Sequence, residues 1–121
     1  MTSRRIHVKG AKVLVLGLTF KENCPDIRNS KVVDVVRELE KFGAQVDVHD
    51  PWVDSREAKH EYGIKPVKAP KARSYDAVVL AVSHQQFKDL GAAAVRRFGR
   101  KNAVVYDIKY LFKADQVDGR L

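Results

Sequence analysis

The sequence predicts an α/β fold, a Rossmann-like three-layer sandwich in which helices cover both faces of a mostly parallel sheet. Two apolar runs, at residues 12–17 and 77–82, have the continuous Val and Leu content of strands that are buried on both faces. Segments with the helical spacing of apolar residues follow these runs. Because strands that alternate with helices form parallel sheets, the 121 residues are expected to make a single domain of this class.

The first half of the chain predicts a strand, a helix and a second strand, in that order. Gly17 ends the first strand, and a long polar connection leads to a helix expected from about Ser30 to Phe42. The apolar residues of this helix recur on one face: Val32, Val33, Val35, Val36, Leu39 and Phe42. Gly43 is suited to terminate the helix, and the alternating residues 44–48 predict a strand that ends before Asp50.

The second half of the chain predicts five further elements. They are a surface helix at residues 53–62, a short edge strand at 64–67, a central strand at 77–82, a helix at 85–98 and a last strand at 103–106. Gly63 and Gly99 are placed to end the two helices. Residues 113–121 show no such pattern and are interpreted as a tail.

Composition places the chain among globular proteins of a reducing compartment. Apolar residues make up 45% of it and charged residues 31%, and no apolar run approaches the roughly 20 residues that span a bilayer. The amino terminus lacks the apolar stretch of a secretion signal, and the sequence holds one cysteine, Cys24. We therefore expect a cytoplasmic protein that has no membrane partner.

The formal net charge of +8 suggests a polyanionic partner, a requirement that phosphate-bearing small molecules meet as well as nucleic acid does. Basic residues gather at Arg4 and Arg5, at 65–73 and at 96–101, without the interleaved aromatic residues of a nucleic-acid stacking surface. The clusters are interpreted as solvated faces, and nucleic acid is not an expected partner. A stand-alone polyanion-binding or nucleic-acid-binding α/β module remains the alternative function.

The connection after the first strand is the most informative candidate site, because ligands of open parallel sheets bind beyond the carboxyl ends of the strands. A dinucleotide-binding fold would place G-x-G-x-x-G there, but the chain has Gly17 followed by Leu-Thr-Phe-Lys-Glu. NAD is therefore not expected to bind this chain by the usual route, and no cofactor-binding residue is assigned. Lys21 and Arg28 stand near the start of the following helix, where they can hold a diphosphate or simply pair with Glu22 and Asp26.

No catalytic or metal-binding residue is assigned. Cys24 has no histidine at short range, and the four histidines lack the spacing of a metal site. Asp50 stands where dinucleotide folds put their ribose-binding acid, or else it caps the segment that follows. His84 and Phe87 are candidates to line the crevice, with helix core as the alternative for Phe87, and Lys109 is expected to point toward the same crevice.

The segment from Gly17 to Ser30 resembles the G-x-x-F-K-x-x-x-x-D-x-R-x-S signature of the carboxy-terminal domain of the UDP-glucose/GDP-mannose dehydrogenase family. The runs Val48-His49-Asp50-Pro51 and Tyr106-Asp107-Ile108-Lys109 are similar to strand ends of that domain. The likeness covers about residues 10 to 112. It implies that residues 1–10 end an interdomain linker, that 11–112 form a UDP-sugar-binding domain and that 113–121 are a tail.

The resemblance implies a role for four residues in substrate binding. Phe20 and Lys21 would line the UDP-sugar site, and Arg28 would order the loop or approach a phosphate. Lys109 would take the position of a basic residue that contacts substrate and is often arginine in the family. Lysine keeps the charge at that position but lacks the bidentate fork of arginine.

The resemblance also implies what this chain lacks. In the family an amino-terminal domain binds NAD, a central helical region forms a homodimer or higher assembly, and an upstream cysteine takes part in oxidising the sugar C6 hydroxyl to a carboxylate. Cys24 does not match that cysteine, so the chain is expected to bind a UDP-sugar without turning it over. The amino-acid sequence around Phe20 and Trp52 is most similar to that of the bacterial branch that acts on UDP-N-acetylhexosamines in capsule or O-antigen polysaccharide synthesis.

Overall fold

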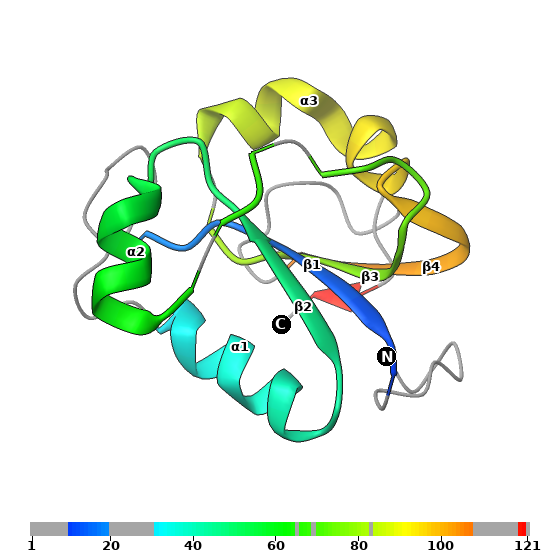
Figure 1. Cartoon of the computed structure of the whole chain (residues 1–121). Coiled ribbons are helices and arrows are strands. Elements are labelled where there is room, and N and C mark those ends of the chain that lie inside the picture. The colour runs from blue at the N-terminus through cyan, green and yellow to red at the C-terminus, as the bar shows by residue number, and fades with distance from the viewer. Residues whose placement is uncertain are drawn as a thin grey trace.

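The computed structural model describes residues 10–19, 31–64, 66–68, 70–82, 84–107 and 119–120. Its elements are β1 (Lys12–Leu16), α1 (Val32–Lys41), β2 (Gln45–His49), α2 (Ser55–Tyr62), β3 (Tyr75–Leu80), α3 (Gln85–Arg96), β4 (Gly99–Asp107) and β5 (Gly119–Arg120). The strands form one sheet in the order β2-β1-β3-β4-β5, and every pairing is parallel. The helices α1 and α3 lie on opposite faces of this sheet (Figure 1), which confirms the predicted three-layer α/β class.

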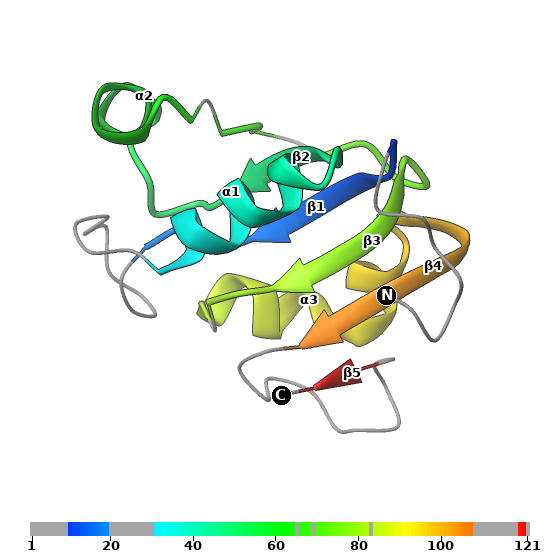
Figure 2. The same cartoon turned by 90° about the horizontal axis from the view of Figure 1, so that it is seen from below.

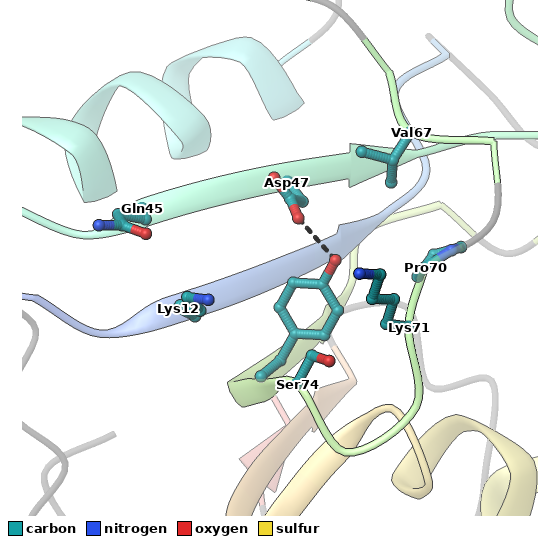
Figure 3. A pocket seen from close by; sticks show the side chains of 8 residues that line it. Lys12, Gln45, Asp47, Val67, Pro70, Lys71 and Ser74 are labelled. Carbon is teal, nitrogen blue, oxygen red and sulfur yellow. Dashed lines mark hydrogen bonds between the residues drawn. The ribbon is translucent and has the colours of Figure 1, made fainter.

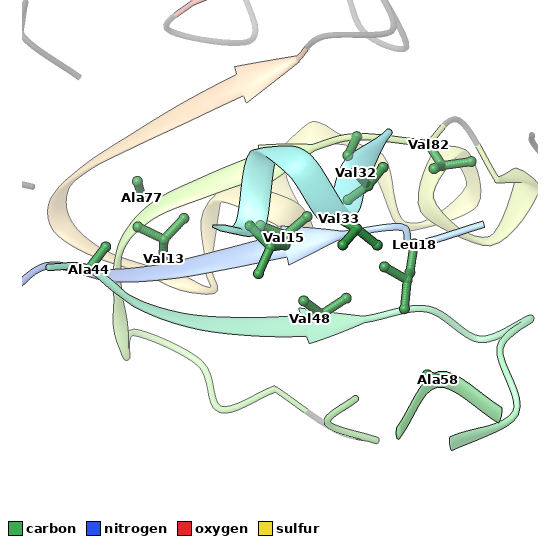
Figure 4. Packing of buried hydrophobic residues seen from close by; sticks show 12 residues of the cluster. Val13, Val15, Leu18, Val32, Val33, Ala44, Val48, Ala58, Ala77 and Val82 are labelled. Atoms are coloured by element: carbon green, nitrogen blue, oxygen red, sulfur yellow. The ribbon is translucent and has the colours of Figure 1, made fainter. Parts of the chain in front are cut away.

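Two apolar clusters, one on each face of the sheet, make up the core. Val13 and Val15 of β1 join the cluster beneath α1, whereas Leu14 and Leu16 join the cluster beneath α3. All four side chains are fully buried, as expected for a strand with helices on both sides. Figure 4 shows the α1 side, where valines of the strand and the helix meet.

Helix α1 is shorter than its apolar pattern predicts. It runs from Val32 to Lys41 and buries Val32, Val33 and Val36. Phe42 lies beyond the last turn and is 61% exposed, so its assignment to the buried face was wrong. The chain turns at Gly43, where φ is +93°, and this reversal carries Phe42 away from the sheet.

Helix α2 ends at Tyr62 as predicted but begins at Ser55, two residues later than expected. The Asp54 side chain accepts hydrogen bonds from the backbone N–H groups of the first turn, and Gly63 ends the helix in the left-handed conformation. Of the predicted edge strand at 64–67, the described residues 64, 66 and 67 are not in a strand. Val67 donates one backbone hydrogen bond of 2.8 Å to Val48 but forms no ladder. Pro66 has no N–H to contribute, which removes a ladder donor from this edge.

The remaining elements differ from the prediction in their bounds. Helix α3 was expected to continue to residue 98, but it kinks at Gly91, where φ is +81° and ψ is 157°, and ends at Arg96. Strand β4 begins at Gly99 and shifts register against β3 before Val104 pairs with Ala77. Gly119–Arg120 adds β5 beside β4, a strand that no sequence pattern indicates (Figure 2).

Candidate functional site

The carboxyl ends of β1, β2 and β3 meet at one edge of the sheet, where the sequence predicts a ligand site. Gly17 follows β1 with a φ of +106°, and its N–H donates to the His49 carbonyl over 2.8 Å. A Cβ atom on Gly17 would lie 2.6 Å from the Cβ of Val82 and 2.8 Å from its backbone nitrogen. Glycine is therefore required here for the close approach of two strand ends.

Asp50 ties the ends of β1 and β2 together. Its Oδ2 accepts the backbone N–H groups of Leu18 at 2.7 Å and of Thr19 at 3.2 Å. Its Oδ1 accepts the N–H of Trp52 at 2.8 Å. The last bond confirms the predicted capping role, and the first two show that the carboxylate also anchors the segment after β1.

His84 brings the end of β3 into the same network. Its Nε2 lies 2.8 Å from Oδ2 of Asp50 and 3.1 Å from Oγ1 of Thr19. Because an ionised carboxylate can only accept, Nε2 carries the hydrogen, and this tautomer follows from the hydrogen-bond network. Thr19, Asp50 and His84 are 1%, 5% and 0% exposed, so the network is enclosed.

Aromatic side chains surround the imidazole of His84. The ring centroids of Trp52 and Phe87 lie 6.1 and 5.5 Å from that of His84. The indole Nε1 of Trp52 donates to Gln86 over 3.0 Å, and Phe87 is buried in the cluster beneath α3. The helix-core interpretation of Phe87 is thus confirmed, and His84, the other candidate to line the crevice, is fully buried.

The hydrogen bonds keep Asp50 ionised despite its burial. Burial by itself raises the pKa of this carboxyl, but the bonds from His84 and from the N–H groups of Leu18 and Trp52 outweigh it, and the pKa lies below its ordinary value of 3.8. A negative charge therefore stands at this edge at neutral pH.

This geometry does not fit a dinucleotide. In a dinucleotide-binding fold the N–H groups of the turn after the first strand face the pyrophosphate, and the acid after the second strand meets a ribose. Here the N–H groups of Leu18 and Thr19 donate to Asp50, and all three groups are buried. The network instead holds Leu18 and Thr19 in a defined place on the sheet edge.

The four predicted substrate-binding residues, Phe20, Lys21, Arg28 and Lys109, lie outside the described residues, as does Cys24. The structure does place the residues from which two of these segments start. Thr19 precedes Phe20 at the end of β1, and Asp107 precedes the Lys109 segment at the end of β4, in register with Leu80 of β3. Both segments therefore leave the sheet at the same edge.

The network of Thr19, Asp50 and His84 is the feature that sequence analysis missed. Asp50 and His84 were each identified as a single polar residue after a predicted strand, but their contact was not predicted. The signal that could have predicted the contact was their common position, because the carboxyl ends of neighbouring parallel strands meet at one edge. Within the described ranges, no group of three or more His, Cys, Asp or Glu could hold a metal ion, and no helix is long and apolar enough to cross a membrane.

A hollow of 380 Å³ lies at the opposite, amino-terminal edge of the sheet. Figure 3 shows Lys12, Lys71, Asp47 and Ser74 around it. The hydroxyl of Tyr75 donates to Oδ2 of Asp47 over 2.6 Å. Burial and this neighbouring carboxylate raise the pKa of Tyr75, so the phenol stays protonated and the bond is retained at neutral pH.

Comparison with known proteins relates the whole chain to sugar-nucleotide dehydrogenases. Over all 121 residues it is 57% identical to the UDP-N-acetyl-D-glucosamine 6-dehydrogenase of Pseudomonas aeruginosa and 53% identical to that of Salmonella typhi. It is 36% identical over 113 residues to Protein CapL of Staphylococcus aureus. The chain spans 29%, 28% and 26% of the lengths of these relatives, so each of them is much longer.

Solved structures give the same relationship. A UDP-glucose dehydrogenase from the archaeon Pyrobaculum islandicum superposes on 93% of the chain with a TM-score of 0.72 and 32% identity, although the match covers 25% of that protein. An NDP-N-acetyl-D-galactosaminuronic acid dehydrogenase from Methanosarcina mazei Go1 superposes on 95% of the chain with a TM-score of 0.72 and 25% identity; 24% of that protein is covered.

The sequence pattern of one family covers most of the chain. Residues 14–114 match the UDP binding domain of the UDP-glucose/GDP-mannose dehydrogenase family. This range includes the last three residues of β1, all of β2 to β4 and the network around Asp50. The chain therefore belongs to the UDP-glucose/GDP-mannose dehydrogenase family and corresponds to its UDP binding domain.

Proposed function

We propose that this chain is the substrate-binding domain of an NAD-dependent UDP-N-acetylhexosamine 6-dehydrogenase, which oxidises the C6 hydroxyl to a carboxylate for polysaccharide precursor synthesis. The observation that carries the proposal is the identity of 57% and 53%, over the entire chain, to two proteins named UDP-N-acetyl-D-glucosamine 6-dehydrogenase. The similarity to Protein CapL supports the same family but gives no finer assignment.

The arrangement of the sheet edge supports a diphosphate site between two lysines. Strands β1 and β4 flank β3, and neighbouring strands are about 4.8 Å apart, so their carboxyl ends are separated by about 10 Å. Lys21 follows β1 and Lys109 follows β4. From these positions two flexible ammonium groups can reach one diphosphate, with Phe20 against the nucleotide and Arg28 near the phosphate or ordering the loop.

The rest of the reaction belongs to parts of a longer enzyme in this proposal. The N–H groups of Leu18 and Thr19 are taken by Asp50, so NAD would bind a separate amino-terminal domain, which would supply the hydride acceptor. The oxidation would use residues outside this chain, with the central region forming a homodimer or higher assembly. A cytoplasmic enzyme is the form that fits a nucleotide-sugar substrate.

The test is a titration of the chain with UDP, followed by amide chemical shifts. Saturable shifts are expected around residues 20–30 and 107–109 at about 1 mM UDP, a weak affinity because only one side of the cleft is present. Lys21→Ala and Lys109→Ala should each weaken binding several-fold. Lys41→Ala is the matched control, because Lys41 is exposed in the last turn of α1, close to the opposite edge of the sheet.

Unchanged amide shifts at both segments would overturn the proposal that the chain binds UDP by itself. Equal losses in Lys21→Ala, Lys109→Ala and Lys41→Ala would overturn the two-lysine site and indicate a general charge effect. The alternative, an independent polyanion or nucleic-acid module, would be favoured by steeply salt-dependent binding to random DNA without a response to UDP.

A further inference from the structure

A second hollow, of 480 Å³, opens at the amino-terminal edge of the sheet and is lined by arginines. Its lining residues are Arg73, Ala93, Arg96, Arg97, Gly99 and Arg100. The four arginines come from three segments: the turn before β3, the end of α3 and the start of β4. Tertiary structure thus gathers two basic clusters that are separate in the sequence.

No acidic residue stands among the described residues that line the arginine hollow. Arg100 pairs with Asp76 over 3.1 Å, and this exposed pair neutralises one of the four guanidinium groups. Across the described part of the chain, no acidic side chain forms an ion pair with Arg73 or Arg97. Like charges held together at one hollow repel one another unless an anion joins them.

The end of α3 explains only part of the arrangement. Cations at a helix carboxyl terminus are stabilised by the exposed carbonyl groups, which accounts for Arg96 and Arg97. It does not account for Arg73, which has a φ of +57°, in the left-handed region that glycine and asparagine adopt more readily. The N–H of Arg73 donates to the Arg97 carbonyl over 2.8 Å, and this bond ties the two arginine segments together.

We propose that the arginine hollow binds an oligophosphate, either free or as the phosphate tail of a nucleotide. Guanidinium groups bind phosphate oxygens through paired, charge-assisted hydrogen bonds, and several of them around one concavity match an anion with several charges. Among the described residues, no aromatic side chain lines the hollow, so the phosphates and not a base are recognised. The neighbouring hollow at Tyr75 is less suited, because the carboxylate of Asp47 faces it.

This site is separate from the proposed UDP site. Gly99 opens β4 beside Tyr75, the first residue of β3, whereas the network of Thr19, Asp50 and His84 lies beyond the other end of that strand. Strand β3 has six residues and is therefore about 20 Å long. One diphosphate cannot occupy both places, so the two proposals stand or fall independently.

The test uses the full chain and inorganic tripolyphosphate, with amide chemical shifts as the readout. Saturable shifts are expected at Arg73, Ala93 and Gly99, with one tripolyphosphate bound per chain. Arg97→Gln should weaken this binding about tenfold, because a charge-assisted hydrogen bond is lost. Arg56→Gln is the matched control, since Arg56 is an exposed arginine of α2 that does not line the hollow.

Arg73→Gly separates binding from folding. Glycine adopts a φ of +57° without strain, so this variant should unfold at the same denaturant concentration as the wild type or a higher one. It should nevertheless lose about tenfold in tripolyphosphate affinity, because one guanidinium is gone. Wild-type affinity in a folded Arg73→Gly variant would overturn the site.

Two further arms identify the ligand source. Equal affinity for tripolyphosphate and for adenosine triphosphate supports recognition of the phosphates alone. If UDP still shifts the amide signals of residues 20–30 in the tripolyphosphate complex, the result supports two sites. Displacement of tripolyphosphate by an equal concentration of UDP would contradict the separate site. Tight binding of a single-stranded oligonucleotide, with equal losses in Arg56→Gln and Arg97→Gln, would show a general polyanion surface in place of the hollow.

Discussion

At the scale of single residues, Asp50 joins the ends of three strands. One carboxylate accepts two N–H groups after β1, one after β2 and the imidazole of His84 after β3. Leu18, Thr19 and His84 are buried, so these three donors cannot exchange their bonds for water without opening the edge. Asp50 therefore positions Leu18 and Thr19 at the end of β1.

Asp50→Asn should destabilise the fold by about 3 kcal/mol, because the amide has a single acceptor oxygen. In either orientation its NH₂ group faces an N–H donor, that of Trp52 or those of Leu18 and Thr19. Urea unfolding followed by circular dichroism measures this change in the free energy of unfolding. Asp34→Asn is the control, because Asp34 is exposed in the first turn of α1. Losses of the same size in both variants would show that the network adds nothing specific.

The stability of the chain should depend on pH through Asp50. Its pKa is lowered in the folded state below the ordinary 3.8, so its contribution is fully present above that value and disappears as the pH falls through the lower, folded pKa. The difference in unfolding free energy between the wild type and Asp50→Asn should therefore shrink as the pH falls from about 5 to about 2. A difference that stays constant over this range would contradict the ionised carboxylate.

At the scale of elements, Gly17 allows the end of β1 to lie close to the segment that follows β3. The N–H groups of Ala81 and Val82 both donate to the Leu16 carbonyl, at 2.9 and 3.3 Å. This crossing leaves no room for a side chain at Gly17. The glycine of the family signature is thus explained by strand packing, not by contact with a phosphate.

Gly17→Ala should cost about 3 kcal/mol or more of unfolding free energy, because the new Cβ meets the backbone of Val82 and the φ of +106° is strained for alanine. Gly63→Ala is the matched control. Gly63 also has a positive φ, of +69°, but an added Cβ would meet nothing within 4 Å, so only the backbone strain of about 1 kcal/mol remains. Similar losses in the two variants, measured by urea unfolding, would remove the packing argument.

The kink in α3 has a comparable local cause. Gly91 adopts a φ of +81° and a ψ of 157°, which interrupts a helix that otherwise runs from Gln85 to Arg96. The second part of that helix then delivers Arg96 and Arg97 to the arginine hollow. A single glycine therefore sets the direction of the helical segment that ends at Arg96.

At the scale of the whole molecule, the sheet joins two edges of different chemistry. The carboxyl-terminal edge holds a buried carboxylate and the start of the lysine-bearing connection, whereas the amino-terminal edge holds the arginine hollow and the pocket at Tyr75. Both core clusters run between these edges, so each site is supported by the same packed layers.

The chain should unfold in a single cooperative transition, because both clusters share β1. Trp52 is the only tryptophan, and its indole ring lies beside His84, so its fluorescence reports on the carboxyl-terminal edge. Urea transitions followed by Trp52 fluorescence and by far-ultraviolet circular dichroism are expected to coincide. An earlier fluorescence transition would show that this edge opens separately from the sheet.

Local patterns were sufficient for most of the fold. The continuous run of β1 and the apolar face of α1 identified a buried strand and its covering helix, and Gly63 marked the end of α2 correctly. The errors fell where a local pattern continued past the point at which the chain changes direction. Phe42 fits the apolar repeat of α1 but follows its last turn, and the helix formers around Gly91 conceal a kink.

The sequence by itself determined the class of the fold, the order of its main elements and the family, because periodicity and a contiguous signature are local properties. Only the tertiary structure decided which side chains meet. Asp50 and His84 are 34 positions apart, and Thr19 and His84 are 65 apart, yet parallel pairing brings all three to one edge. Arg73 joins Arg96 and Arg97 in the same way, since residues at corresponding ends of neighbouring elements become neighbours when the sheet forms.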